Sequence, residues 1–235
     1  MKNRFYGDVN DYIKYGILDI LSKEYKRIGI NWYLTDDRHG NQMHGNDIRY
    51  LDKSEKWERY NPRIFKLLKQ RVGIAKQRDI SFCKTDGVIT FHAEHVEQLP
   101  DNLSCSLYPA ARKAWHNKAL TTLSDCNLVF FDPDIGIKSK LARDPVKASE
   151  YCELSEITDY TWCDWLIVVF PGRFSRYEGL MTNPIISAVQ NKKKVMAFLC
   201  GRMVLLYISN NIQAGILSQV FKEWGTKIGT KILIP

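Results

Sequence analysis

The segment NLVFFDPDIGI, residues 127–137, joins a continuous apolar run to two carboxylates that flank a proline. Continuous apolar runs are typical of strands that are buried on both faces, as in a parallel sheet between helices. The tip of such a strand needs no carboxylate for its own stability, whereas ligands of open α/β sheets bind just beyond it. We therefore predict a buried strand that ends at Phe131, followed by a functional site that contains Asp132, Pro133 and Asp134. An Asx-type turn at a strand end is the alternative.

Other parts of the chain show the same alternation of buried strands and helices. Four further apolar runs predict buried strands: INWYLT (30–35), DWLIVVF (164–170), KVMAFLC (194–200) and RMVLLYIS (202–209). Shorter strands are predicted in DISFCKT (79–85) and VITFHAE (88–94), around a turn at Asp86-Gly87. The spacing of apolar residues predicts helices at about 8–27, 54–72, 108–124, 145–160, 184–190 and 214–224.

Strands that alternate with helices indicate an α/β fold. We expect a single doubly wound, mostly parallel sheet with helices on both faces, which is a Rossmann-like arrangement. The length of 235 residues suits one such domain, spanning residues 1–235. The helix at about 8–27 precedes the first strand.

The composition narrows the class of partner. The chain carries 34 Lys and Arg against 26 Asp and Glu, a net charge of +8. This balance favours contact with phosphates, and therefore nucleic acid as a partner, although a solvated lysine surface explains it equally well. No apolar run reaches membrane-spanning length, and the first residues lack the apolar core of a signal peptide. Six scattered cysteines without a CxxC pair suit reduced thiols, so we expect a cytoplasmic protein with no membrane partner.

A polar loop follows the strand at 30–35 and holds Asp36, Asp37, His39 and Gly40. Carboxylates at this place can accept hydrogen bonds from the hydroxyl groups of a ribose, and glycine allows the backbone to approach a ligand closely. The loop matches neither the G-x-G-x-x-G fingerprint nor the P-loop. A metal site that includes His39 and His44, or an inert surface loop, are the alternatives.

Two motifs of the chain resemble those of a known superfamily. VFFDPDIG (129–136) is similar to the Asp-Pro-Pro-Tyr tetrad of class I S-adenosylmethionine-dependent methyltransferases that modify the amino groups of bases. GDVNDYIKYG (7–16) is similar to the Gly-Asn-x-x-Asp-x-x-Lys-His segment of 23S ribosomal RNA adenine-N6 methyltransferases and of three-Cys-motif partner proteins. YLTDDRHGN (33–41) stands where those ribosomal RNA enzymes have a glycine-rich loop. The chain also resembles a group of bacterial and prophage proteins with GDxxDYxKYG and DPDxG motifs.

The resemblance implies S-adenosylmethionine as the cofactor. It assigns Lys14 to the carboxylate of the cofactor, with Asp8 in the same segment. The methionine and ribose end of the cofactor would be lined by the loop residues Asp36, Asp37, His39 and Gly40. The glycine-rich loop of the family is reduced here to Gly40 and Gly45.

The resemblance also implies a nucleic-acid base as the substrate, methylated at an amine of the adenine N6 type. Asp132 and Pro133 would hold the amine for in-line attack on the methyl group. Asp134 replaces the second proline of the tetrad, and Ile135 replaces the aromatic residue. Stacking on the base would then come from elsewhere. The candidates for contact with nucleic acid are Arg173, Phe174, Arg176 and Tyr177.

Two other functions are compatible with the sequence. A metal-dependent nuclease or phosphoesterase would use Asp132, Asp134 and Asp36 to hold magnesium, whereas the methyltransferase interpretation involves no metal. A non-catalytic member of the fold would bind nucleic acid or a protein partner, and the diluted glycine-rich loop favours this. The sequence leaves open the target base, the choice between DNA and RNA, and the oligomeric state.

Overall fold

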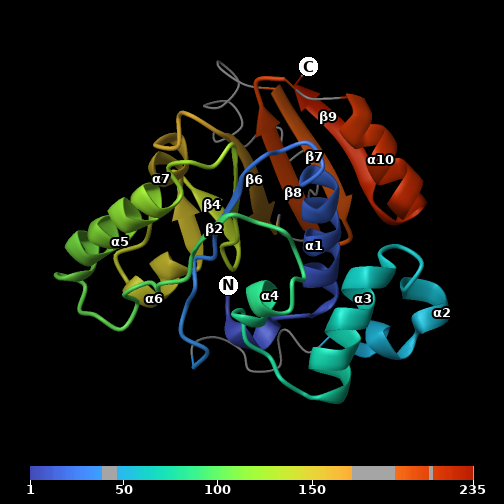
Figure 1. Ribbon diagram of the computed structural model, residues 1–235. Helices are drawn as coiled ribbons and strands as arrows, with labels where there is room; N and C mark the ends of the chain where they lie inside the picture. The colour runs from blue at the N-terminus through green and yellow to red at the C-terminus, as the bar shows by residue number, and fades with distance from the viewer. Residues whose placement is uncertain (39–46, 171–193, 212–213, 235) are drawn as a thin grey trace.

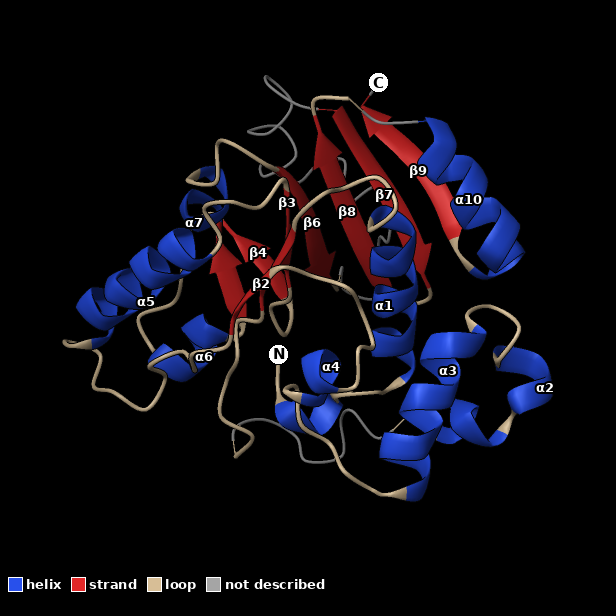
Figure 2. Ribbon diagram, in the orientation of Figure 1, coloured by secondary structure: helices blue, strands red, loops and turns tan. Residues whose placement is uncertain are grey.

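The computed structural model describes residues 1–38, 47–170, 194–211 and 214–234 (Figure 1). Its centre is a seven-stranded sheet with the order β2-β1-β3-β6-β8-β7-β9 (Figure 2). The strands are β1 Ile28–Asn31, β2 Ala93–His95, β3 Leu128–Phe131, β6 Asp164–Val169, β7 Lys194–Cys200, β8 Met203–Ser209 and β9 Gly229–Ile234. Two short strands, β4 Gly136–Lys138 and β5 Tyr151–Glu153, form a separate parallel pair.

The strand directions make the sheet mixed. β1 pairs in parallel with β2 and with β3, and β3 pairs in parallel with β6. β8 is antiparallel to both β6 and β7, and β9 is antiparallel to β7. Only Gly201 and Arg202 separate β7 from β8, and so short a connection can join only antiparallel strands. The predicted α/β fold is confirmed, while the predicted parallel pairing holds only from β2 to β6.

Helices cover both faces of the sheet. They are α1 Val9–Leu21, α2 Ser54–Trp57, α3 Pro62–Leu68, α4 Phe82–Thr85, α5 Tyr108–Thr122, α6 Pro145–Ser149, α7 Leu154–Thr158 and α10 Ala214–Trp224, with shorter turns η1 Asn3–Phe5, η2 Arg49–Asp52, η3 Lys69–Ile74 and η4 Gly225–Lys227. In the described part of the chain, no helix is both long and apolar enough to cross a membrane.

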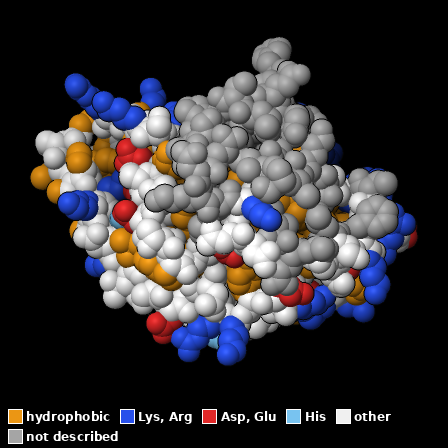
Figure 3. All heavy atoms as spheres, turned by 90° about the horizontal axis from the view of Figure 1, so that it is seen from above, with side chains coloured by type: hydrophobic (Ala, Val, Ile, Leu, Met, Phe, Trp, Pro, Cys, Tyr) orange, Lys and Arg blue, Asp and Glu red, His pale blue; other side chains and the backbone are white. Residues whose placement is uncertain are grey.

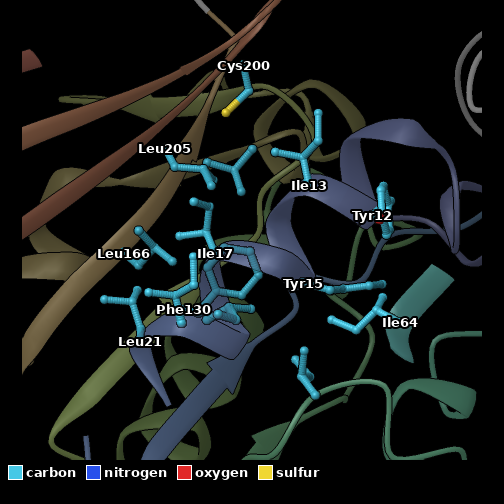
Figure 4. Close-up of a cluster of buried hydrophobic side chains, with 14 of the residues drawn as sticks. Tyr12, Ile13, Tyr15, Ile17, Leu21, Ile64, Phe130, Leu166, Cys200 and Leu205 are labelled. Carbon is cyan, nitrogen blue, oxygen red and sulfur yellow. The ribbon is translucent and has the colours of Figure 1, made fainter. Parts of the chain in front are cut away.

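Strand β3 shows why the sheet strands are apolar throughout. Phe130 belongs to the core cluster formed with α1 and α10, whereas Val129 and Phe131 belong to the cluster formed with α5 and α7. Each side chain buried in this way stabilises the fold by about 1.5–3 kcal/mol. Figure 4 shows the first cluster, where Ile17 of α1 lies beside Phe130 and Tyr15 lies towards Ile64 of α3.

Helix α1 is fixed by residues at its start and at its centre. The Asp8 carboxylate accepts the backbone N–H groups of Asn10 and Asp11, which the first turn of a helix leaves without partners. Near the centre, a Cβ at Gly16 would lie 2.1 Å from the Trp224 ring of α10, so glycine permits the close contact of the two helices. The helix ends at Leu21, earlier than the predicted 27.

The segment 79–94 differs from its prediction. DISFCKT forms the short helix α4 instead of a strand, because the Asp79 carboxylate and the Asn3 side chain accept the N–H groups of Ser81 and Ile80. Of VITFHAE, only Ala93 and Glu94 enter a strand, which extends to His95. Local hydrogen bonding here overrides the β propensity of the apolar residues.

Two predicted helices are divided in the structure. The predicted helix 54–72 consists of α2, α3 and the π-helical turn η3, because Asn61 and Pro62 start a new helix with an Asn61 side-chain cap on Ile64. The predicted helix 145–160 is interrupted by β5, which pairs with β4. The carbonyl of Glu150 accepts the N–H of Ile135, so pairing with the segment after Pro133 takes over from helical bonding.

Candidate functional site

The site lies where the strand order of the sheet reverses. The next two strands along the chain lie on opposite sides of β1, with β2 on one side and β3 on the other. The carboxyl ends of β1 and β3 therefore border a crevice. Asn31 and Phe131, the last residues of these strands, are in register. A pocket of about 1110 Å³ opens at this edge and is lined by the start of α1, by residues 132–135, and by Phe170, Cys200, Gly201, Arg202 and Lys227. This is where the sequence predicts a site.

A buried ion cluster forms the inner wall of the pocket. The Lys14 Nζ lies 2.9 Å and 3.1 Å from the two carboxylate oxygens of Asp132, and 3.0 Å from Asp11 Oδ1. All three side chains line the pocket, and none of the three residues is more than 5% exposed. Lys14 therefore positions the carboxylate that follows β3, a role that the sequence motif alone does not show.

Asp11 is the centre of the N-terminal motif. Its Oδ2 accepts the backbone N–H of Gly7 at 3.1 Å and the Tyr15 hydroxyl at 2.9 Å, while Oδ1 accepts Lys14. Gly7 has a φ of +74°, which glycine adopts without strain, so its N–H can turn towards Asp11. The motif GDVNDYIKYG thus encodes a helix start that holds Lys14 in place.

The charges of the inner wall shift the pKa values of its members. Burial raises the pKa of Asp132, and Lys14 opposes this effect only in part. Burial alone lowers the pKa of Lys14, but Asp11 and Asp132 raise it overall, so the ammonium stays charged. Burial and the neighbouring Asp11 raise the pKa of Asp8 to about 7.

Asp134 belongs to a separate ion cluster. Its Oδ1 lies 2.8 Å from the α-amino group of Met1, and its Oδ2 accepts hydrogen bonds from Lys2 and, at 3.1 Å, from the Thr35 hydroxyl. Burial alone raises the pKa of Asp134, but the two cations outweigh burial and lower it to about 2. Asp134 thereby ties the chain after β3 to the first residues and to the chain after β1.

The loop acids predicted to bind a cofactor lie at the same edge of the sheet. The backbone N–H of Asp36 donates to Asp101, and its carboxylate pairs with Arg38. Asp37 accepts the backbone N–H of Arg4. Neither acid is among the described residues that line the pocket, whereas Asp8, Lys14, Asp132, Pro133 and Asp134 all line it.

Several predicted site residues lie outside the described part of the chain. These are His39 and Gly40 of the loop after β1, and the nucleic-acid candidates Arg173, Phe174, Arg176 and Tyr177. Their predicted roles remain predictions.

Sequence reasoning missed residues at the opening of the pocket. Trp57, Arg202 and Lys227 line it from α2, from the turn between β7 and β8, and from η4. For Arg202 a signal exists, because two residues between apolar runs at 201–202 indicate a hairpin turn. For Trp57 the sequence signal is its place between the basic residues Lys56 and Arg59, which suits stacking on a base. For Lys227 the sequence offers no signal, since its contact with Trp57 depends on tertiary packing.

The described acids of the site are not arranged to bind a metal ion. Over residues 1–38, 47–170, 194–211 and 214–234, no group of three or more His, Cys, Asp or Glu side chains is placed to hold a metal ion. Asp132 and Asp134 are instead paired with separate cations.

Comparison of the chain with protein-family models, with curated proteins and with solved structures gave no match.

Proposed function

We propose that this protein is a class I S-adenosylmethionine-dependent methyltransferase with a Rossmann-like fold that modifies an amine of a nucleic-acid base, of the adenine N6 type. One observation carries the proposal. The buried carboxylate of Asp132 stands at the carboxyl end of a parallel strand, beside the reversal of strand order, inside a pocket large enough for a nucleoside cofactor and a base.

The residues present fit the proposed cofactor. S-adenosylmethionine carries a sulfonium cation, an ammonium group and ribose hydroxyls, which favour carboxylates as neighbours. Asp8, Asp11, Asp132 and Asp134 all line the pocket and are all buried or nearly so. Phe5, Trp57 and Phe170 supply aromatic surface for a purine ring in the same pocket. When bound, the cofactor supplies an electrophilic methyl group.

The side chains of the pocket would then position the substrate. Among the described residues, Lys14 is the hydrogen-bond donor to the Asp132 carboxylate, so the carboxylate oxygens retain lone pairs for the hydrogens of an amine. Pro133 fixes the backbone that aims this carboxylate. Because burial raises the pKa of Asp132, the carboxylate can also take up the proton that a methylated amine releases.

Calorimetric titration with S-adenosylmethionine and with its demethylated product tests the proposal. We expect both compounds to bind the wild-type protein. The variant Asp132→Asn should keep this binding but lose methyl transfer to an adenine-containing single strand by roughly 100-fold or more.

Asp125→Asn is the matched control, because the Asp125 side chain is 79% exposed and should leave both properties unchanged. Absence of heat with either compound, for a protein that melts cooperatively, would refute the proposal. Full transfer activity in Asp132→Asn would refute the role of Asp132.

The metal-dependent alternative has no comparable support. Its three acids do not converge, because Asp132 pairs with Lys14, Asp134 pairs with Met1 and Lys2, and Asp36 pairs with Arg38.

A further inference from the structure

The charge of the protein is spread widely, so net charge alone identifies no binding surface. On the face seen in Figure 3, the visible Lys and Arg side chains lie at several separate places, most of them near the outline and one towards the centre. A site for an anion has to be found from cations that lack acidic partners and that border a pocket.

Two such cations stand at the opening of the pocket. Arg202 is exposed at the two-residue turn between β7 and β8, and Lys227 is half-buried in η4. Neither side chain forms an ion pair with a carboxylate of the described residues, in contrast to Lys14 on the inner wall. Cations without acidic partners at a solvent-exposed opening attract anions.

The lysine is held in place by an aromatic ring. The Lys227 Nζ lies 4.0 Å from the centre of the Trp57 ring, within the range of a cation–π interaction. Trp57 is itself fixed, because its ring contacts those of Tyr12, Tyr50 and Tyr60. The ammonium group is therefore positioned before any ligand arrives.

The sign of the side-chain charges therefore changes between the buried part of the pocket and its opening. The buried part is acidic, with Asp8, Asp11 and Asp132. The opening carries the cations Arg202 and Lys227, while the exposed acid Asp47 that also lines it is paired with Arg49. A ligand that fits this arrangement directs hydrogen-bond donors or positive charge inwards and negative charge outwards. A nucleotide whose base enters the pocket has this distribution, because its amine leads and its phosphates remain near the opening.

Further exposed cations lie beyond the opening, on and beside α2. These are Lys53, Lys56 and Arg59, which alternate along the sequence with the acids Asp52, Glu55 and Glu58 and form no ion pair with a described carboxylate. Several cations near one opening suit a chain of phosphates better than a single carboxylate or a free mononucleotide.

We infer that Arg202 and Lys227, with the helix α2 beside them, bind the phosphate backbone of a single-stranded nucleic acid whose base enters the pocket. The inference rests on the proposed function, which supplies the reason for a base to enter. A base in a duplex is stacked and paired and does not reach a carboxylate on the inner wall, so the strand is single at the point of entry.

Fluorescence anisotropy with a short labelled oligoadenylate tests this inference. We compare wild type with Arg202→Ala/Lys227→Ala, and with Lys26→Ala/Lys222→Ala as a control. The control removes the same charge from exposed positions that do not line the pocket. In the first double variant the affinity at low salt should fall on the order of tenfold, and the slope of log K against log salt should decrease by about 1.4.

A charge-conserving pair provides the complementary measurement. Arg202→Lys/Lys227→Arg should keep most of the wild-type affinity, because the number of phosphate charges neutralised by the protein is unchanged. A duplex of the same sequence should bind the wild-type protein more weakly than the single strand. Melting temperatures of all variants should match that of wild type.

The outcomes separate this inference from the proposed function. Equal affinity of the two double variants, absence of oligonucleotide binding by the wild type, or preference for the duplex would each overturn the inference. Loss of S-adenosylmethionine binding in Arg202→Ala/Lys227→Ala with unchanged oligonucleotide affinity would also overturn it and assign the cations to the cofactor carboxylate. Oligonucleotide binding that depends on Arg202 and Lys227, without any binding of S-adenosylmethionine, would support the inference and refute the proposed cofactor.

Discussion

Two buried ion pairs belong to helices on opposite faces of the sheet, Lys14 with Asp132 beside α1 and Arg112 with Glu156 between α5 and α7. In both pairs the charged atoms are at hydrogen-bond distance and nearly inaccessible to solvent. Glu156, however, accepts the Tyr33 hydroxyl and the N–H of Glu153 in addition to two nitrogens of Arg112. Among the described residues, the Asp132 carboxylate accepts hydrogen bonds from Lys14 alone.

The pKa values follow this difference in hydrogen bonding. Burial raises the pKa of both acids, but for Glu156 the hydrogen bonds from Arg112 outweigh burial and lower the pKa overall. For Asp132 burial prevails, and the pKa is raised. A carboxylate whose acceptor sites are filled stabilises the fold, whereas one with remaining acceptor sites, beside a pocket, can bind a ligand.

The largest effect is expected from removal of the arginine. Arg112→Met leaves the buried Glu156 charge without its cation and the carbonyls of Ala148 and Tyr151 without their donor. The free energy of unfolding should fall by about 3–5 kcal/mol. Urea denaturation measures it, with the exposed neighbour Lys113→Met as the control. A loss below that of the control would show that the pair is not structural.

A smaller and pH-dependent effect is expected from Lys14→Met. The variant leaves Asp11 and Asp132 facing each other without a cation, and the free energy of unfolding should fall by about 3 kcal/mol at pH 8. At pH 5 the loss should be smaller, because Asp132, whose pKa is already raised, takes up a proton. Denaturation at both pH values measures this. An equal loss of unfolding free energy at pH 5 and pH 8 would contradict the difference inferred between Asp132 and Glu156.

The smallest effect is expected at the helix cap. The pKa of Asp8 is raised from 3.8 to about 7 in the folded protein, so its contribution to stability is present below pH 3.8 and is lost as the pH rises through 7. Asp8→Asn keeps a good cap without the charge, and should gain on the order of 2 kcal/mol relative to wild type between pH 5 and pH 8. Thermal melting across this range measures the gain. Parallel pH profiles of wild type and variant would contradict it.

Much of the fold could be predicted because strands that are buried on both faces are continuous apolar runs in the sequence. The runs around Phe130 and Leu166 are apolar at every position, and the structure confirms them as central strands. The same property hides strand direction, since a doubly buried strand has the same composition whether its neighbours run parallel or antiparallel. Only the short connection at Gly201-Arg202 reveals the reversal.

The sequence predicts where the candidate site lies, but it does not predict which of its side chains contact one another. Asp132 was found from its place after an apolar run, and the structure brings it beside the predicted Lys14. The contact between these two residues depends on α1 lying over the sheet, and no local pattern encodes that contact. Trp57 and Lys227 are separated by most of the chain, so their contact is a property of tertiary packing alone.

The contact of Lys227 with Trp57, and that of Trp224 with Gly16, join the last part of the chain to the first. During synthesis on the ribosome, the carboxylates at Asp8, Asp11 and Asp132 emerge long before these final partners. Until Lys227 has emerged, the opening of the pocket has Arg202 but lacks its second cation. We therefore expect a chain arrested before residue 224 to bind polyanions more weakly than a chain that includes Lys227.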